Sequence, residues 1–351
     1  MTEESSFRYN KGLADRFVSD FKMPIAMTQS IYFPYFLQMY EAEYGSLRKW
    51  NALWKMIDER YDGNPEKFLD DYYNVRDRII NDVLENPAFK EFNTGDMSRF
   101  VVKDAPNVSK NSVYNQTYDG KILLSVDLRK ANFQALKYVN KDIVFGADSY
   151  RDFIHRWTDL DYVAESKYSR QVIWGKCNPS RQITVEKFLI NEVRKTIETG
   201  GVEITDGLKL TLVSMSNDEL VYMVDGFGKD YYSEDAEVHF SNTSTRIEET
   251  ALKQLGLEVS TEIFKLDMHE LLSKPSYDAK EKHRTTFYTR EDLITGDVTM
   301  KGVPLPYHAI VYKIFNGFEP QEEDYHFIYE GIDCTFNEDF YIKSNPNYIK
   351  L

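Results

Sequence analysis

Apolar positions recur at helical spacing through much of the first hundred residues. One such stripe fits a single helix face: Leu47, Trp50, Leu53, Trp54 and Ile57. Asn64-Pro65 is typical of a helix N-cap followed by proline in the first turn. A second stripe then runs from Phe68 to Val83 and stops before Asn86-Pro87. The pattern predicts two long amphipathic helices whose aromatic residues belong to the core.

The pattern changes after residue 94. Scattered Asn, Ser, Gly and Asp predict loops as far as residue 120, and Lys121–Val126 (KILLSV) predicts a strand that ends at Asp127. Helical spacing returns over Ala131–Val139 and in short pieces over residues 150–175. Asn178-Pro179 then begins another helix, which Gly200-Gly201 stops.

The segment Leu210–Val224 (LTLVSMSNDELVYMV) has two apolar runs around the polar triplet Asn217, Asp218 and Glu219. Branched and aromatic residues in the flanks predict two β-strands joined by the triplet as a turn. Adjacent carboxylates held by buried strands are candidate ligands for Mg²⁺, which binds oxygen. When the triplet is taken alone, a solvated turn is the favoured explanation, because Asn-Asp is common in such turns.

The remaining sequence predicts a helix over Ile247–Leu255, a strand over Glu258–Leu266, and a mixed segment from about residue 270. We therefore expect an α+β protein with a small antiparallel sheet and packed helices. The expected organisation is a helical N-terminal region (1–110), a catalytic domain (111–269) and a mixed C-terminal segment (270–351). No function is assigned to the last of these.

Composition narrows the class of protein. The chain has 351 residues, and its hydrophobic content of 42% is enough for a sizeable core. No apolar run of about 18 residues predicts a membrane span. The N-terminus is polar and lacks a signal-peptide core, so a cytoplasmic protein is expected. Cys177 and Cys334 are too few for a disulfide framework or a cysteine-rich zinc site.

Charge is distributed unevenly. The net charge of −14 argues against broad, non-specific nucleic-acid binding, which needs clustered Lys and Arg. The segment Lys167–Lys195 nevertheless carries seven basic and two acidic residues, and we call it the basic segment. It is either a solvated helix face or a surface that binds phosphate.

Asp127 and Asp218 each stand at a predicted strand end. A small sheet can bring two such ends to one edge, where Asp127, Asp218 and Glu219 could hold two metal ions. The basic segment lies between them in sequence and could clamp a triphosphate, because positioning and charge neutralisation supply most of phosphoryl-transfer catalysis. Spacing alone does not place the two strands side by side.

Two of these segments resemble motifs of the family A (DNA polymerase I-like) DNA polymerases. Tyr118–Asp127 (YDGKILLSVD) resembles the "dGxxLLxaD" strand that delivers the first catalytic aspartate. Ser216–Tyr222 (SNDELVY) resembles the third motif, "VHDELVFEV", with Ser-Asn in place of Val-His and Tyr222 in place of Phe. The resemblance spans roughly residues 115–266 and implies a polymerase-like palm. By resemblance, Asp127, Asp218 and Glu219 are catalytic, and Asp127 and Asp218 bind Mg²⁺ or Mn²⁺.

A third segment is similar to the fingers helix of the same family. Arg170–Gly175 (RQVIWG) is similar to "KxxNFG", which implies that Arg170 binds the triphosphate and Trp174 stacks on the base. Lys167 lies near the place of a second basic residue, although not at the usual spacing. Asn178 departs from the family's Tyr.

The segment from Asn178 to Gln182 is also similar to "NxxxQG", a helix that contacts the primer–template. The overlap implies shortened fingers, and it implies nucleic-acid contacts by four residues: Lys176, Asn178, Arg181 and Gln182. Asn132 stands where DNA-specific members carry a Glu against the ribose, so the choice of sugar stays open.

The resemblance implies a minimal metal-dependent nucleotidyltransferase. Its substrates would be a nucleotide triphosphate and the 3′ end of a primer–template nucleic acid, and so reduced a chain is expected to extend short primers or to need a protein partner for grip. Two alternatives remain. One is a catalytically inactive, polymerase-like scaffold that binds nucleic acid or protein, and the other is an unrelated metal-dependent nuclease.

Overall fold

The computed structural model describes residues 7–109, 113–200, 208–226, 231–273, 283–336 and 341–344. Helices in these ranges are α1 (Lys11–Phe21), α2 (Phe33–Met39), α3 (Glu41–Tyr44), α4 (Ser46–Tyr61), α5 (Pro65–Glu85), α6 (Pro87–Thr94), α7 (Ala131–Val139), α8 (Tyr150–Ile154), α9 (Asp161–Glu165), α10 (Lys167–Gly175), α11 (Pro179–Glu198), α12 (Glu234–Thr250) and α13 (His308–Phe315). Strands are β1 (Lys121–Leu128), β2 (Lys209–Met215), β3 (Glu219–Asp225), β4 (Val259–Ser273), β5 (His283–Asp292), β6 (Val298–Lys301), β7 (His326–Tyr329), β8 (Ile332–Thr335) and β9 (Tyr341–Ser344).

The fold is α+β, and its main sheet is antiparallel. Within the described ranges this sheet has the strand order β2-β3-β1-β4-β5-β6, and β9 pairs with β4. β4 pairs with β1 through its first half and with β5 through its second half. It therefore joins the hairpin region to the C-terminal strands in one continuous surface.

The two faces of the sheet have different neighbours. Leu124 and Val126 of β1, together with Tyr222 of β3, belong to the main apolar core, which also includes residues of α7, α11 and α12. The opposite face has only a small apolar cluster around Leu123 and Phe264. Because side chains alternate along a strand, Ser125 and Asp127 point to this second face.

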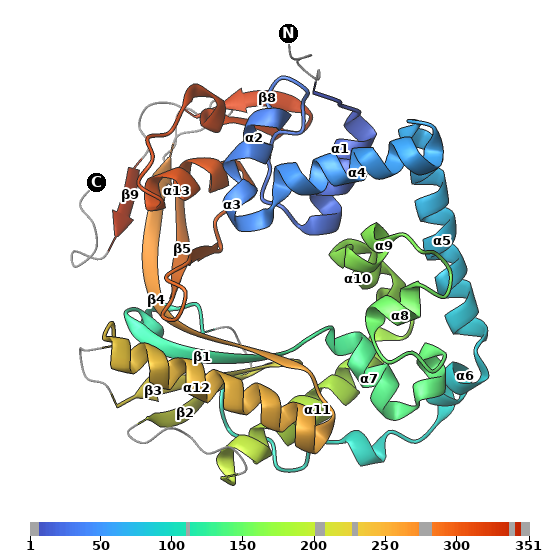
Figure 1. Ribbon diagram of the computed structural model, residues 1–351. Helices are drawn as coiled ribbons and strands as arrows, with labels where there is room; N and C mark the ends of the chain where they lie inside the picture. Colours follow the sequence, from blue (N-terminus) through green and yellow to red (C-terminus); the bar gives the residue numbers. More distant parts are fainter. Residues whose placement is uncertain are drawn as a thin grey trace.

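The elements follow one another around a ring in Figure 1, with the sheet on one side and α4, α5 and α6 on the other. The ring closes where α2 and its C-cap residue meet the C-terminal segment. The Tyr40 hydroxyl lies 2.8 Å from Nδ1 of His308, and the Tyr35 hydroxyl donates to Asp324 at 2.8 Å. Asp324 also pairs with Lys313 at 2.8 Å, and Lys313 contacts the Tyr35 hydroxyl, so the two tyrosines join the N-terminal helices to this buried ion pair and to His308.

Most elements agree with the sequence pattern. The Asn64 side chain accepts a hydrogen bond from the Lys67 backbone N–H, which confirms the predicted N-cap of α5. β1 continues past the expected end, so Asp127 lies within the strand and not after it. The hairpin of β2 and β3 is confirmed, although Glu219 is the first residue of β3 and not part of the turn.

Two expected boundaries move. α12 begins at Glu234, well before the predicted start at Ile247. β4 runs unbroken through residue 269, because its second half is covered by β5 and the sheet continues beyond the expected boundary. The division into three regions stays a prediction. Gly201, the second of the glycines expected to stop a helix, lies outside the described residues. No helix in the described ranges is long and apolar enough to cross a membrane.

Candidate active site

The end of strand β1, which carries Asp127, lies beside the hairpin turn that carries Asp218. β1 pairs with β3 in an antiparallel register that sets Asp127 opposite Glu219. The backbone N–H of Leu128 donates to the carbonyl of Asp218 at 2.9 Å. The structure therefore supplies what spacing could not, which is the placement of the β1 end beside the hairpin turn.

Short polar contacts fix the turn that carries Asp218. The Ser216 backbone N–H donates to the Glu219 carbonyl at 2.9 Å, and the Glu219 N–H donates to Ser216 Oγ at 3.2 Å. Ser125 Oγ, from β1, donates to Glu219 Oε1 at 2.6 Å. Glu219 is thus held by the strand that carries Asp127, and one of its oxygens is already occupied by a protein donor.

The Asp127 carboxylate lies in an environment that disfavours its charge. Its side chain makes no hydrogen bond or ion pair with the residues that the structure describes. Burial, followed by the negative charges of Asp218 and Glu219, raises the pKa of Asp127 to about 7, against the opposing effect of Lys167 and Arg290. A group held this way near neutrality, without a partner, is typical of a functional site.

Glu186 is a further carboxylate near the site, and sequence reasoning missed it. It lies on α11 with 4% of its surface exposed, and Asn132 Nδ2 donates to it at 2.5 Å. Burial and then the charge of Asp218 raise the pKa of Glu186 to about 7. No sequence motif marks this residue; the helical stripe of α11 simply places it on the buried side.

The first turn of α10 brings basic groups toward Asp127. Lys167 is exposed and Arg170 is half-buried, with its guanidinium 5.8 Å from the centre of the Tyr150 ring. Neither side chain has an acidic partner within ion-pair distance in the described part of the chain. Burial lowers the pKa of Arg170, whereas Tyr150 and Asp127 act in the opposite direction. Both predicted triphosphate ligands therefore lie within electrostatic reach of the predicted metal ligand.

A buried carboxylate fixes the start of α10. Ser166 is the N-cap of this helix, and its Oγ donates to Asp20 at 2.7 Å. Asp20 is fully buried and also accepts hydrogen bonds from Tyr72 at 2.7 Å and Tyr162 at 2.8 Å. Arg16 completes the set, 3.2 Å from Asp20. Asp20 therefore ties α1, α5, α9 and α10 together and positions Lys167, although nothing in its sequence context shows this.

Trp174 is buried, whereas stacking on a nucleotide base would need an exposed face of its ring. Only 1% of the residue is exposed, and its ring lies 5.1 Å from the ring of Phe153. Ser169, Ile173 and Trp174 form the buried side of α10, and the partly buried Arg170 lies one turn before Trp174. Trp174 therefore packs in the core of this structure, and base stacking by Trp174 stays a prediction.

The four predicted nucleic-acid contacts also lie away from the carboxylates or serve the fold. Gln182 is fully buried and donates to the Trp174 carbonyl at 2.9 Å and to the Cys177 carbonyl. Asn178 donates to Asn93 at 2.9 Å, and Arg181 donates to the carbonyl of Gly95. Gln182 therefore satisfies backbone groups at the α10–α11 junction, and Asn178 and Arg181 fasten it to the region of α6. Lys176 is exposed beside them.

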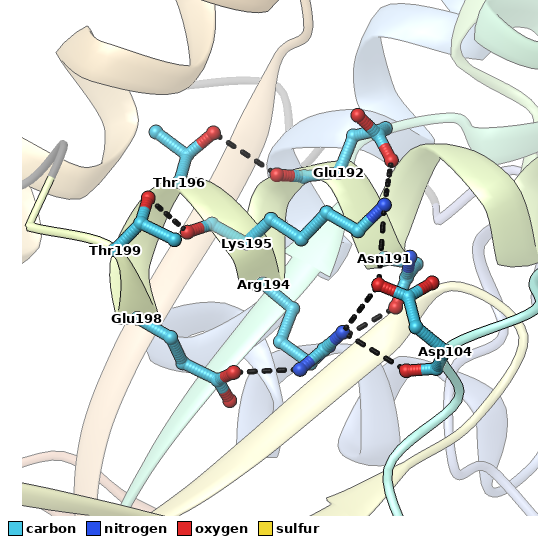
Figure 2. A network of polar contacts seen from close by, with 8 residues as sticks. All are labelled: Asp104, Asn191, Glu192, Arg194, Lys195, Thr196, Glu198 and Thr199. Carbon is cyan, nitrogen blue, oxygen red and sulfur yellow. Dashed lines mark hydrogen bonds and ion pairs between the residues drawn. The ribbon is translucent and has the colours of Figure 1, made fainter.

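The end of the basic segment is neutralised by its neighbours. Figure 2 shows Arg194 and Lys195 surrounded by acidic side chains from α11 and from the preceding loop. Arg194 pairs with Glu198 at 2.6 Å and with Asp104 at 3.6 Å. Lys195 pairs with Glu192 at 3.0 Å and with Asp104 at 3.3 Å. Arg194 and Lys195 are therefore not available to bind phosphate, whereas Lys167 and Arg170, and also Lys187 beside Ser216 and Asn217, have no acidic partner in the described part of the chain.

The donor set suits a hard divalent cation. Asp127 and Asp218 offer carboxylate oxygens, and the crowding that raises the pKa of Asp127 would be relieved by a bound cation. Within the described ranges no group of three or more His, Cys, Asp or Glu is arranged to hold a metal ion. Mg²⁺ commonly binds through one or two carboxylates together with substrate phosphates, so Asp127 and Asp218 fit such a shared site.

Comparison with known proteins gives no match. No family model matches the chain, and neither a curated protein nor a solved structure is similar to it. The site is accordingly interpreted from its own geometry and charge.

Proposed function

We propose that this protein is a metal-dependent nucleotidyltransferase with a polymerase-like palm. One observation carries the proposal: Asp127, with a pKa raised to about 7, stands opposite Glu219 and beside the Asp218 turn, within electrostatic reach of Lys167 and Arg170. Opposed carboxylates and unpaired cations are the two components that phosphoryl transfer to a 3′ hydroxyl requires.

In this proposal each residue has a distinct task. Asp127 and Asp218 hold Mg²⁺ or Mn²⁺, which supplies charge stabilisation and activates the attacking hydroxyl. Lys167 and Arg170 bind the phosphates of a nucleotide triphosphate and orient them toward the carboxylates. Glu219 has one oxygen engaged by Ser125, so it supports the turn and adds negative charge to the site.

The decisive experiment is extension of a labelled primer–template by the full chain with nucleotide triphosphates and Mg²⁺ or Mn²⁺. Asp127→Asn and Asp218→Asn are each expected to lower the rate by about 10³-fold, because each removes a charge that holds the metal. Asp235→Asn is the matched control, since Asp235 is exposed in the first turn of α12.

The outcomes separate the functions that the sequence leaves open. Extension that survives both substitutions at close to the wild-type rate would exclude this site. Shortening of the labelled strand, abolished by the same substitutions, would indicate a nuclease. A blank assay with both metals, alongside salt-sensitive binding of the primer–template, would indicate a non-catalytic scaffold.

The scaffold is the second candidate because two observations favour it. Trp174 is buried in the core, which leaves its stacking role unfilled. Arg194 and Lys195 are paired with acidic neighbours, which leaves less positive surface for nucleic acid than the sequence indicates. Both would be expected of a palm that keeps its architecture without its chemistry.

A further inference from the structure

The C-terminal strands place two cations on the same sheet face as the predicted metal ligands. Strand register shows this: Asp127 lies opposite Ser260 of β4, and Leu266 of β4 lies opposite Arg290 of β5. Lys301 of β6 lies opposite Tyr288, two residues from Arg290. Because alternate residues share a face, Arg290 and Lys301 project on the side that carries Asp127.

These residues line one groove with a volume of about 430 Å³. Its charged and polar lining includes Ser125, Asp127, Glu219, Glu262, Arg290 and Lys301. The groove therefore begins at the candidate metal site and extends across β4 to β5 and β6. It joins the strands that carry Asp127 and Glu219 to a segment for which sequence analysis predicts no function.

The two cations differ in how they are held. Arg290 is buried, pairs with Glu262, and donates to the Tyr114 hydroxyl at 2.9 Å. Its guanidinium also lies 3.9 Å from the centre of the Phe264 ring, and its Nε has no hydrogen-bond partner. Lys301 is exposed at the groove and makes no hydrogen bond or ion pair with a described residue. Several contacts thus hold the Arg290 guanidinium in place, whereas no described residue pairs with the Lys301 ammonium.

We propose that Lys301 and Arg290 form a polyphosphate subsite that binds the terminal phosphates of the nucleotide substrate. The inference rests on the proposed function and extends it to β5 and β6. A phosphate here would lie between Lys301 and a cation on Asp127, and Lys167 would approach from α10. Burial and the charge of Arg290 lower the pKa of Lys301, and Lys167 adds to this effect. Arg290 and Lys301 thus place two positive charges at one end of the groove, where an anionic group can bind between them.

The charges of the groove make this binding depend on a divalent cation. Without metal, three carboxylates (Asp127, Glu219 and Glu262) oppose the two cations Arg290 and Lys301. The lining then carries a net negative charge and repels phosphate. One bound Mg²⁺ reverses the sign, so polyphosphate and metal are expected to bind cooperatively.

The test is a calorimetric titration of the full chain with inorganic tripolyphosphate, with and without Mg²⁺. Wild-type affinity is expected to fall at least tenfold when Mg²⁺ is omitted. Lys301→Ala is expected to weaken binding about tenfold in Mg²⁺, as for loss of one charge-assisted contact. Lys301→Arg should stay within about threefold of wild type. Lys55→Ala, at an exposed position on α4, is the matched control for loss of one positive charge.

A parallel titration with a short single-stranded oligonucleotide distinguishes the two sources of phosphate. If Lys301→Ala weakens binding of the oligonucleotide but not of tripolyphosphate, the groove holds a nucleic-acid backbone and the proposal is overturned. Unchanged binding of tripolyphosphate by Lys301→Ala, or no binding by wild type, overturns it as well.

The subsite and the proposed function fail in different ways. If the wild type extends the primer but Lys301→Ala binds tripolyphosphate as tightly as the wild type does, the proposed function stands and the proposed subsite is wrong. If tripolyphosphate binding needs both the metal ion and Lys301 but no primer extension is seen, the subsite stands and the assignment as a polymerase is wrong. Thermal unfolding of each variant serves as the check that the fold is intact.

Discussion

The two ends of the basic segment look alike in sequence and differ in the structure. At its beginning, Lys167 and Arg170 have no acidic partner and lie within electrostatic reach of Asp127. At its end, Arg194 and Lys195 are paired with Asp104, Glu192 and Glu198 (Figure 2). A count of charges cannot separate these cases, because whether a cation can take a phosphate depends on whether the fold has already neutralised it.

The middle of the segment contributes mainly to packing. Trp174 and Gln182 are buried, and their contacts serve the packing and the backbone of the α10–α11 junction. Lys176 and Lys187 are exposed and have no acidic partner among the described residues. The proposed phosphate contacts of Lys167 and Arg170 can therefore be tested against the paired cations at the other end.

The largest expected effect tests whether Trp174 is structural. Trp174→Ala should lower the free energy of unfolding by about 4 kcal/mol, because it leaves a large cavity against Phe153. Urea denaturation measures the loss. Trp174→Phe should keep most of the stability and bind nucleotide as wild type does. A loss of nucleotide affinity in Trp174→Phe at unchanged stability would restore the stacking role.

Substitution of Asp20 tests how the beginning of the basic segment, with Lys167 and Arg170, is positioned. Asp20→Asn should lower the free energy of unfolding by about 3 kcal/mol, because it leaves Arg16 without its charged partner and replaces one of the two oxygens that accept from Tyr72 and Tyr162 with an amide donor. Since Ser166 loses its anchor, tripolyphosphate binding should weaken even where the variant is folded. Asp15→Asn, in the same helix and half-exposed, provides the control. Equal stability of wild type and Asp20→Asn would contradict this role.

The raised pKa of Glu186 can be tested by measuring the free energy of unfolding as a function of pH. In the folded protein the pKa of Glu186 is raised to about 7, which is above its value in the unfolded chain. Between about pH 4 and pH 7 the native state therefore holds a proton that the unfolded state has lost. Its contribution to stability is fully present below pH 4 and is lost as the pH rises through 7. Glu186→Gln keeps an acceptor for Asn132. It should therefore match wild type near pH 4 and exceed it by about 2 kcal/mol at pH 8.

Denaturation profiles of wild type and Glu186→Gln, subtracted from one another, isolate this effect from other groups. The subtraction matters because burial lowers the pKa of His308 to about 4, and that histidine acts in the opposite sense at acid pH. A difference that stays constant between pH 4 and pH 8 would contradict the raised pKa of Glu186.

The smallest effects compare the two ends directly. Arg194→Ala should lower the free energy of unfolding by about 1 kcal/mol, because its ion pairs are partly exposed, and should leave tripolyphosphate binding unchanged. Lys167→Ala should leave stability within about 0.5 kcal/mol and weaken tripolyphosphate binding several-fold. Both variants are measured by urea denaturation and calorimetry. The reverse pattern would show that the paired end, and not the first turn, binds phosphate.

Local signals in the sequence were sufficient for most elements. Asn64-Pro65 predicts the start of α5 because an N-cap and a first-turn proline act within one turn. The alternation around Asn217 predicts the hairpin of β2 and β3. The start of α12 was missed, since its early turns carry Glu234, Asp235 and Glu237 and bury few apolar residues.

For the site, the sequence indicated Asp127, Asp218 and Glu219; the structure places Asp127 and Glu219 on adjacent strands and Asp218 in the turn beside them. It gave no indication of Glu186, Asp20, Arg290 or Lys301, which come from four distant elements. These residues matter through burial, partners and a shared sheet face, and such relations arise only when the elements pack.

The sequence by itself determined the elements and the residue types that can bind metal and phosphate, because propensity, capping and alternation act over a few neighbouring positions. Tertiary structure alone decided which charges stay unpaired. The same Lys or Arg is neutralised where the fold brings an acid within about 4 Å, as at Asp104, and remains available where it does not, as at Lys167. Function therefore depends on partners that are far away in sequence.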